Sequence, residues 1–235
     1  MTNRVNHNLH EVRQRIVQAC AAAGRAVDSV TLLAVSKTFG ADAVRAAFAA
    51  GQRAFGENYV REALDKISDL ADLRQLIEWH LIGPLQSNKT RTVAAAFDWV
   101  HSIDRLKIAQ RLAAHRPAGL PPLQVCLQVN ISAQASKSGL LPDEVLAVAQ
   151  AVAALPNLRL RGLMAIPEPA EGDAAQRAPH RALRELLATL NAAGLGLDTL
   201  SIGMSADLEA AVAEGATLVR VGTAIFGGRV APAAA

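Results

Sequence analysis

Lys37 is the residue of this sequence best placed for covalent chemistry. It follows a run of apolar and β-branched residues over 31–36, which predicts a buried parallel strand. Parallel α/β folds place their chemistry at the carboxyl ends of such strands. Partial burial there lowers the pKa of a lysine and makes its neutral amine available as a nucleophile. A lysine whose stem lies on the strand end while its ammonium reaches water explains this stretch equally well.

A glycine- and serine-containing segment at 201–207 could hold a phosphate group. Gly203 allows the backbone to come close to a ligand beside Met204. Ser205 is a suitable N-cap for a helix expected over 206–214, whose free N–H groups favour an anion.

A second such segment, 220–227, follows the last expected strand. In it Gly222 and Thr223 offer backbone donors and a hydroxyl group. Ordinary turn chemistry explains the residues of both segments as well. Two segments at the places where barrel enzymes commonly hold phosphate nevertheless favour a phosphate site.

Arg220 lies in the middle of an apolar strand. Strand alternation puts it on the same face as Leu218 and Gly222, which would be the interior of a barrel. A buried guanidinium is costly unless it has a partner, so it should face a ligand or an acid. The competing explanation is a buried salt bridge to Glu57 or Asp207.

A strand-end lysine, a phosphate site and a buried arginine together suggest pyridoxal 5'-phosphate (PLP). Its aldehyde would form a Schiff base with Lys37, and Arg220 would face the pyridine nitrogen. Arginine stays cationic, so the ring would remain unprotonated and a weak electron sink. Asn58 and Asn130, each expected just after a strand, could hydrogen-bond the ring hydroxyl or orient the imine.

Three other polar residues near strand ends have weaker claims. His80 lies within an apolar strand and is more simply a hydrogen-bonded core histidine. Lys89 and Lys137 are most simply solvated charges, although the loop that carries Lys137 should overhang the mouth of the site.

The elements that would position these residues alternate between strand and helix after a first helix at 8–23. The expected strands span 31–36, 53–57, 78–82, 98–101, 123–130, 158–165, 198–202 and 217–221. The expected helices span 41–50, 58–71, 86–96, 104–115, 142–154, 173–193 and 206–214.

Eight such units predict a single-domain (β/α)8 TIM barrel over about 30–229, with an extra N-terminal helix, as the one domain of 1–235. An open doubly wound sheet is the alternative. It would normally carry a glycine-rich fingerprint after the first strand, and residues 36–39 do not form one.

The amino-acid composition limits the kinds of molecule that this protein is expected to bind. Of the 235 residues 51% are hydrophobic and only 3% aromatic, and the net charge is +3, so neither stacking platforms nor a basic stripe predicts a nucleic-acid partner. Cys20 and Cys126 lack metal-ligand spacing and are expected as buried free thiols. Residues 1–10 are polar, and no apolar run approaches the roughly 20 residues of a spanning helix. We therefore expect a cytoplasmic protein with no membrane partner.

Six motifs, in this order, resemble the pyridoxal phosphate homeostasis protein family. They are Val35–Thr38, Phe55–Asn58, His80–Lys89, Ser136–Gly139, Gly203–Leu208 and Arg220–Gly227. The resemblance covers about residues 10 to 229 and implies a barrel similar to the N-terminal domain of alanine racemase. It also implies PLP on Lys37, phosphate contacts around Ser205, Gly222 and Thr223, and Arg220 beside the ring nitrogen.

The resemblance further implies that the protein stores, buffers or delivers PLP. Recipients would be PLP-dependent apo-enzymes, and the protein would be a monomer. Relatives often have a second lysine and a proline just after the Lys-Thr pair, where this chain has Phe39 and Gly40. A cofactor relay through that second lysine is therefore not expected here.

The alternative function is a PLP-dependent amino-acid racemase of the alanine racemase type. Racemisation needs a second acid or base on the face of the imine opposite the lysine. Related racemases take it from an additional β domain, which the short segment after the last strand does not provide. The single tyrosine, Tyr59, is expected as a packing residue, and neither cysteine is expected at the rim. The carrier role is therefore preferred, and a PLP-free interaction scaffold is the third possibility.

Overall fold

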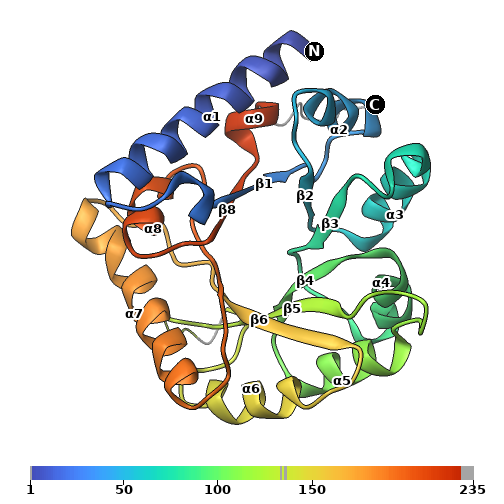
Figure 1. Ribbon diagram of the computed structural model, residues 1–235, viewed down its shortest axis with the longest axis vertical. Coiled ribbons are helices and arrows are strands. Elements are labelled where there is room, and N and C mark those ends of the chain that lie inside the picture. The colour runs from blue at the N-terminus through green and yellow to red at the C-terminus, as the bar shows by residue number, and fades with distance from the viewer. Residues whose placement is uncertain (1, 133, 135–136, 229–235) are drawn as a thin grey trace.

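The computed structural model describes residues 2–132, 134 and 137–228. Eight parallel strands form a closed barrel in which each strand pairs with the next and β8 pairs with β1 (Figure 1). The strands are β1 Thr31–Val35, β2 Ala54–Glu57, β3 Glu78–Leu81, β4 Trp99–Ile103, β5 Leu123–Gln128, β6 Leu158–Met164, β7 Thr199–Ser201 and β8 Leu218–Val221. The predicted (β/α)8 barrel is confirmed, and the open sheet is excluded by the β1–β8 pairing.

Helices surround the barrel (Figure 1). The α-helices are α1 Thr2–Ala22, α2 Ala41–Ala49, α3 Val60–Asp69, α4 Thr90–Ala96, α5 Leu106–His115, α6 Val145–Ala153, α7 Asp173–Ala192, α8 Leu208–Ala213 and α9 Thr223–Phe226. Short 3-10 turns lie at Val27–Ser29, Ala71–Leu73 and Ser87–Lys89. Among the described residues, no helix combines the length and the apolar character needed to cross a bilayer.

The first helix is longer than the sequence pattern predicted. It begins at Thr2 rather than at residue 8, because the buried face continues backwards from Leu9 to Val5 at helical spacing. It lies on the outside of the barrel alongside α8 and α9, the helices that follow the last two strands (Figure 1).

The interior of the barrel is partly polar. Apolar side chains form two interior clusters, which are Leu33, Val35, Ala54, Ile82 and Leu218, and Trp99, Cys126 and Met164. Strand alternation turns His80, His101, Ser201 and Arg220 to the same interior, and all four are buried. The larger apolar core lies outside the barrel wall, between the strands and the helices.

Both cysteines are buried free thiols, as expected. Cys20 lies on the inward face of α1, and Cys126 faces the barrel interior from β5. Burial raises the pKa of the Cys126 thiol to about 12, so a thiolate is strongly disfavoured there.

Candidate functional site

A cavity of about 350 Å³ opens at the carboxyl ends of the strands. This size is within the range of small-molecule sites, about 300–1,000 Å³. All of the predicted site residues line it, namely Lys37, Asn58, Met204, Ser205, Arg220, Gly222 and Thr223. They come from the ends of β1, β2, β7 and β8, which lie far apart in sequence. The structure therefore brings the predicted set together, while the role of each residue stays a prediction.

Lys37 is half-buried directly after β1, and both of its neighbours are held by α3. The Lys66 Nζ donates to the Ser36 carbonyl oxygen at 2.7 Å. The Thr38 N–H donates to Glu62 Oε1 at 2.5 Å, and Thr38 has a φ of 69°. A non-glycine residue rarely adopts this backbone region, so surrounding contacts must hold it there. Helix α3 thus fixes the backbone on both sides of Lys37.

A buried ion pair anchors this arrangement. The Lys66 Nζ lies 2.6 Å from Glu57 Oε1 and 2.7 Å from Glu62 Oε1. The Ser36 hydroxyl also donates to Glu57 Oε1, at 2.6 Å. Burial raises the pKa of the Glu57 carboxyl, although Lys66 and Ser36 both favour its ionised form. The sequence analysis missed Lys66, because its place on an amphipathic helix looks like that of any solvated lysine.

Arg220 is 5% exposed and binds neutral acceptors. Its Nη1 donates to the carbonyl oxygen and, at 2.9 Å, to the hydroxyl of Ser201, and its Nη2 donates to the Ala165 carbonyl at 2.8 Å. Neither salt bridge considered from the sequence forms among the described residues, since Glu57 pairs with Lys66 and Asp207 with His180. Burial lowers the pKa of the Arg220 guanidinium to about 10, which still leaves it charged at neutral pH.

The turn after β7 is shaped by Gly203 and Asp207. Gly203 has a φ of 89°, and a Cβ there would lie 2.5 Å from Ala211 Cβ, so only glycine fits. The Asp207 carboxylate accepts the Met204 N–H at 2.6 Å and lies 2.9 Å from His180 Nε2.

One detail predicted for this turn is wrong. Ser205 is not an N-cap, because the helix begins at Leu208 and Asp207 occupies the cap position. The bond from Asp207 back to the Met204 N–H closes a turn ahead of the helix. Any anion contact by Ser205 must therefore come from its own hydroxyl and the turn backbone.

Helix α1 supports both turns from outside the barrel. Arg15 donates to the Ser205 carbonyl at 3.0 Å and pairs with Glu209 of α8 at 2.8 Å. The Asn8 side chain donates to the Ile225 carbonyl of α9 at 2.8 Å. The extra helix thus contacts the backbone of both candidate phosphate segments. No pattern around Asn8 or Arg15 signals this role in the sequence.

Asn58 is held against the cavity by a glycine on the next strand end. A Cβ on Gly83 would lie 2.2 Å from the Asn58 carbonyl oxygen, so any side chain there would displace Asn58. The Ser102 hydroxyl holds Gly83 in turn, donating to its carbonyl at 2.6 Å. The buried Oδ1 of Asn58 has no hydrogen-bond partner, which marks a position where a ligand group can bind.

Asn130 does not line the cavity. Its side chain binds the backbone of its own loop, donating to the Gln134 carbonyl at 2.7 Å and accepting the Gln134 N–H at 3.2 Å. It lies in a neighbouring depression that also contains Lys137, whose Nζ donates to the Ile166 carbonyl at 3.4 Å. The proposed contact of Asn130 with a ring hydroxyl is therefore not supported. Ser136, the first residue of one motif, lies outside the described residues.

Three other residues that the sequence analysis discussed lie away from the cavity. Lys89 is exposed on a 3-10 turn, as expected of a solvated charge. His80 is a buried, hydrogen-bonded histidine of the barrel interior, also as expected. Tyr59 was expected to be a packing residue, but it is 53% exposed, because it precedes α3 instead of lying on its inward face. Phe39, which stands where relatives often have lysine, contacts Phe226 at the cavity with ring centroids 5.2 Å apart.

Replacing Lys66 tests whether the ion pair supports the Lys37 segment. We expect Lys66→Met to lower the free energy of unfolding by about 3–5 kcal/mol, because it leaves a buried carboxyl group without its cation. Urea unfolding measures the change, with Lys107→Met on the exposed face of α5 as the control, expected within about 0.5 kcal/mol of the parent. A Lys66→Met variant as stable as the control would contradict this role. Glu57→Gln in the same chain should recover part of the loss.

The environment of the Asp207 carboxyl predicts that the free energy of unfolding depends on pH. Burial opposes its ionisation, but the bonds from His180 and the Met204 N–H outweigh burial and lower its pKa below 3.8. A lowered folded-state pKa contributes stability that is present above pH 3.8 and is lost as pH falls through the folded value. Asp207→Asn should therefore be less stable at pH 7 by about 1 kcal/mol. The difference between the two proteins should shrink in urea unfolding near pH 3; a constant difference would refute the assignment.

Comparisons with known proteins show the family to which the chain belongs. Residues 2–230 match the family model described as alanine racemase, N-terminal domain. The pyridoxal phosphate homeostasis protein of Pseudomonas aeruginosa is 64% identical over 225 residues, covering 96% of each chain. That of Escherichia coli is 54% identical over 228 residues, covering 97% of each. The structure of PipY from Synechococcus elongatus with PLP bound is similar, with a TM-score of 0.82, 38% identity, and coverage of 95% of this chain and all of PipY. The chain belongs to the pyridoxal phosphate homeostasis protein family.

Proposed function

We propose that this protein binds PLP as a Schiff base on Lys37 and serves PLP homeostasis, by storing, buffering or delivering the cofactor. The observation that carries the proposal is the convergence of Lys37, Arg220 and two glycine-containing turns on one cavity. The relatives support it, since two are named pyridoxal phosphate homeostasis proteins and PipY has a structure with PLP bound.

Each group of the cofactor has a matching residue in the cavity. The phosphate would lie between Ser205 and the Gly222–Thr223 segment, where hydroxyl groups and backbone donors are available. The Arg220 guanidinium would face the ring nitrogen, and Asn58, with its unpartnered Oδ1, would lie beside the ring substituents. Bound PLP would contribute an electrophilic aldehyde and an electron-accepting ring. Arg220 stays charged at neutral pH and gives up no proton readily, so beside the ring nitrogen it would keep the electron-accepting capacity of the ring weak.

The lining of the cavity favours a carrier over a racemase. Of the described residues that line it, only Lys37 and Arg220 are titratable. Racemisation needs a second proton donor or acceptor across the imine from the lysine. Tyr59 is exposed outside the cavity, and the buried Cys126 thiol has a raised pKa. The described part of the site thus offers Lys37 as an acid or base on one side of the imine, and no second acid or base on the other side.

We extend the proposal to the setting of the protein. It would act in the cytoplasm as a single-domain monomer, with PLP-dependent apo-enzymes as recipients. Two free cysteines suit a reducing compartment.

Borohydride reduction tests the attachment site directly. The protein is saturated with PLP, reduced, digested and mapped by mass spectrometry. We expect one pyridoxyl group on Lys37 at near-complete occupancy, because an imine reduces to a stable secondary amine. Lys37→Ala should lose both the label and the visible absorbance of the bound cofactor, whereas Lys89→Ala, at an exposed lysine, should retain both. A label that persists in Lys37→Ala, or that is found mainly elsewhere, would refute the assignment.

A second experiment separates carrier from enzyme. The PLP-loaded protein is incubated with L- and D-amino acids in deuterated water, and exchange of the α-proton is followed by NMR. We expect exchange no faster than with free PLP, because the described lining of the cavity offers no second acid or base. The same preparation should restore the activity of an apo-aminotransferase. Exchange well above that of free PLP would favour the racemase, and failure to restore the apo-enzyme would count against delivery.

A further inference from the structure

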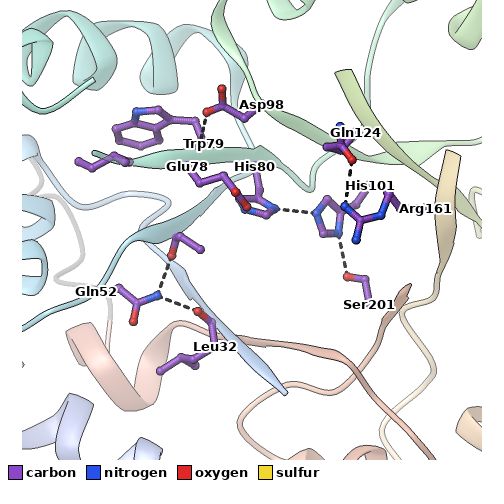
Figure 2. A network of polar contacts seen from close by, with 12 residues as sticks. Leu32, Gln52, Glu78, Trp79, His80, Asp98, His101, Gln124, Arg161 and Ser201 are labelled. Carbon is purple, nitrogen blue, oxygen red and sulfur yellow. Dashed lines mark hydrogen bonds and ion pairs between the residues drawn. The ribbon is translucent and has the colours of Figure 1, made fainter. Parts of the chain in front are cut away.

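A row of polar side chains crosses the barrel interior from the floor of the cavity to the opposite end. Arg220 Nη1 donates to Ser201 Oγ at 2.9 Å, and Ser201 Oγ lies 2.8 Å from His101 Nδ1. His101 Nε2 is hydrogen-bonded to His80 Nδ1 at 2.9 Å (Figure 2). Glu78 Oε1 lies 2.7 Å from His80 Nε2, an ion-pair contact that is not aligned as a hydrogen bond. We call these five residues the hydrogen-bond wire, with Glu78 joined to it by this ion-pair contact. Four of them are buried, and Glu78, whose side chain is 51% exposed, reaches solvent at the amino ends of the strands.

The hydrogen positions along the wire follow from its two ends. The His80 ring beside it lowers the pKa of the Glu78 carboxyl, so Glu78 is ionised and carries no hydrogen. A carboxylate oxygen 2.7 Å from His80 Nε2 requires a hydrogen on that nitrogen, and a ring with its one hydrogen on Nε2 accepts at Nδ1. His101 must in turn donate from Nε2 and accept at Nδ1, so the Ser201 hydroxyl donates to it. The Ser201 oxygen is left to accept from Arg220, which can only donate.

The neutral state of the His101 ring has a structural basis. Burial lowers the pKa of His101 well below its ordinary value, and the charge of Arg220 acts in the same direction. His80 stacks on Trp99, with ring centroids 5.3 Å apart and an interplanar angle of 12°. Arg161 lies over the Trp99 ring, 4.9 Å from its centroid, and is itself paired with Asp198 at 2.8 Å. Together with Glu78, Arg161 and Asp198 are the charged residues among the described residues that line the depression at this end of the wire.

The order of hydrogens in which each imidazole donates from Nε2 and Ser201 donates to His101 orients every dipole of the wire favourably. The Ser201 oxygen and the unprotonated nitrogens of both imidazoles point toward the Arg220 cation. Their N–H and O–H groups point toward the Glu78 carboxylate. In the opposite order, with His101 donating from Nδ1, the Ser201 oxygen would accept from both His101 and Arg220, and the Ser201 hydroxyl hydrogen would have no acceptor in the wire. Among the described residues the hydrogen-bond partners of Arg220 are all neutral, and through these groups the guanidinium receives a negative potential.

We propose that Ser201, His101 and His80 are positioning residues that hold Arg220 in place and link its charge to Glu78 at the far end of the barrel. In the PLP-loaded protein the wire would keep the guanidinium against the ring nitrogen, and in this respect the inference rests on the proposed function. The order of the hydrogens, by contrast, is a property of the protein alone, so it can be tested without the cofactor.

Nitrogen NMR of histidine in the cofactor-free protein tests that order. With 15N-labelled histidine at about pH 8, above the ordinary histidine pKa, we expect both His80 and His101 as neutral rings with hydrogen on Nε2. Assignment uses His80→Gln and His101→Gln. Hydrogen on Nδ1 of either ring, or a doubly protonated ring at this pH, would overturn the proposal even if PLP binds normally.

Glu78→Gln tests the dependence on the carboxylate. An amide accepts a weaker bond than a carboxylate and can also donate, so the tautomer ratio of His80 should move about tenfold toward hydrogen on Nδ1. Glu185→Gln, at an exposed carboxylate of α7, is the control and should leave the ratio unchanged. An unchanged tautomer ratio in Glu78→Gln would also overturn the proposal. The variant is expected to fold, because the Glu78 side chain is 51% exposed.

The link to Arg220 is tested by a pair of variants at Ser201. Ser201→Ala removes the hydroxyl from the wire, and we expect PLP affinity to fall about tenfold while His101 loses its single tautomer. Ser201→Thr keeps a hydroxyl at the same position and should restore both. Loss of a single tautomer in Ser201→Ala with no change in PLP affinity would show that the wire does not position Arg220. Absence of PLP binding in the unmodified protein, with the expected tautomers, would instead refute the proposed function.

Discussion

The pairing of the first strand with the last is the constraint on which the site depends. Closure of the barrel aligns Leu33 with Arg220 and Ala34 with Val221. It therefore brings the end of β1, where Lys37 lies, beside the Gly222–Thr223 segment. A sheet that stayed open between β8 and β1 would separate the two groups by the full width of the sheet. The register of this one strand pair thus determines whether a lysine and a phosphate site share a cavity.

Two buried cations near this seam are stabilised in different ways. Lys66 has a direct counter-ion in Glu57 and serves the backbone around Lys37. Arg220 lies on the cavity floor, and its nearest partners are a hydroxyl and two carbonyl oxygens. A carboxylate next to Arg220 would neutralise the charge that a ligand could meet. Neutral acceptors keep the guanidinium in place and leave its charge available to the cavity.

The sequence predicted the barrel and the cavity residues well, because strand ends in a parallel barrel must converge on one rim. Lys37, Arg220 and the glycine-containing segments 201–207 and 220–227 could therefore be assigned to one site, because each lies at or near the carboxyl end of an expected strand. Element ends were less predictable. The helix after β7 begins later than its serine suggested, since a contact between Asp207 and the Met204 N–H decides where the turn ends.

Other features lay beyond any sequence pattern, because they depend on contacts between distant residues. Gly83 looks like an ordinary turn glycine, yet its lack of a side chain allows it to touch Asn58. Asn130 was expected to contact a ligand, but its side-chain amide is hydrogen-bonded to the backbone of Gln134 in its own loop. The pairing of His80 with His101 requires knowledge of which strands are neighbours and how far each is staggered.

The position of helix α1 has a consequence for biosynthesis. This helix is made first, but its polar contacts from Asn8 and Arg15 go to segments that follow the last two strands. One edge of β1 likewise stays unpaired until β8 has been synthesised, because β8 is its hydrogen-bonding partner on that side. Because a ribosome adds only about 5–20 residues per second, the amino-terminal segment spends seconds without these partners. The cavity is therefore complete only after β8 and α9 have left the exit tunnel, because Arg220 and the Gly222–Thr223 segment are part of its lining.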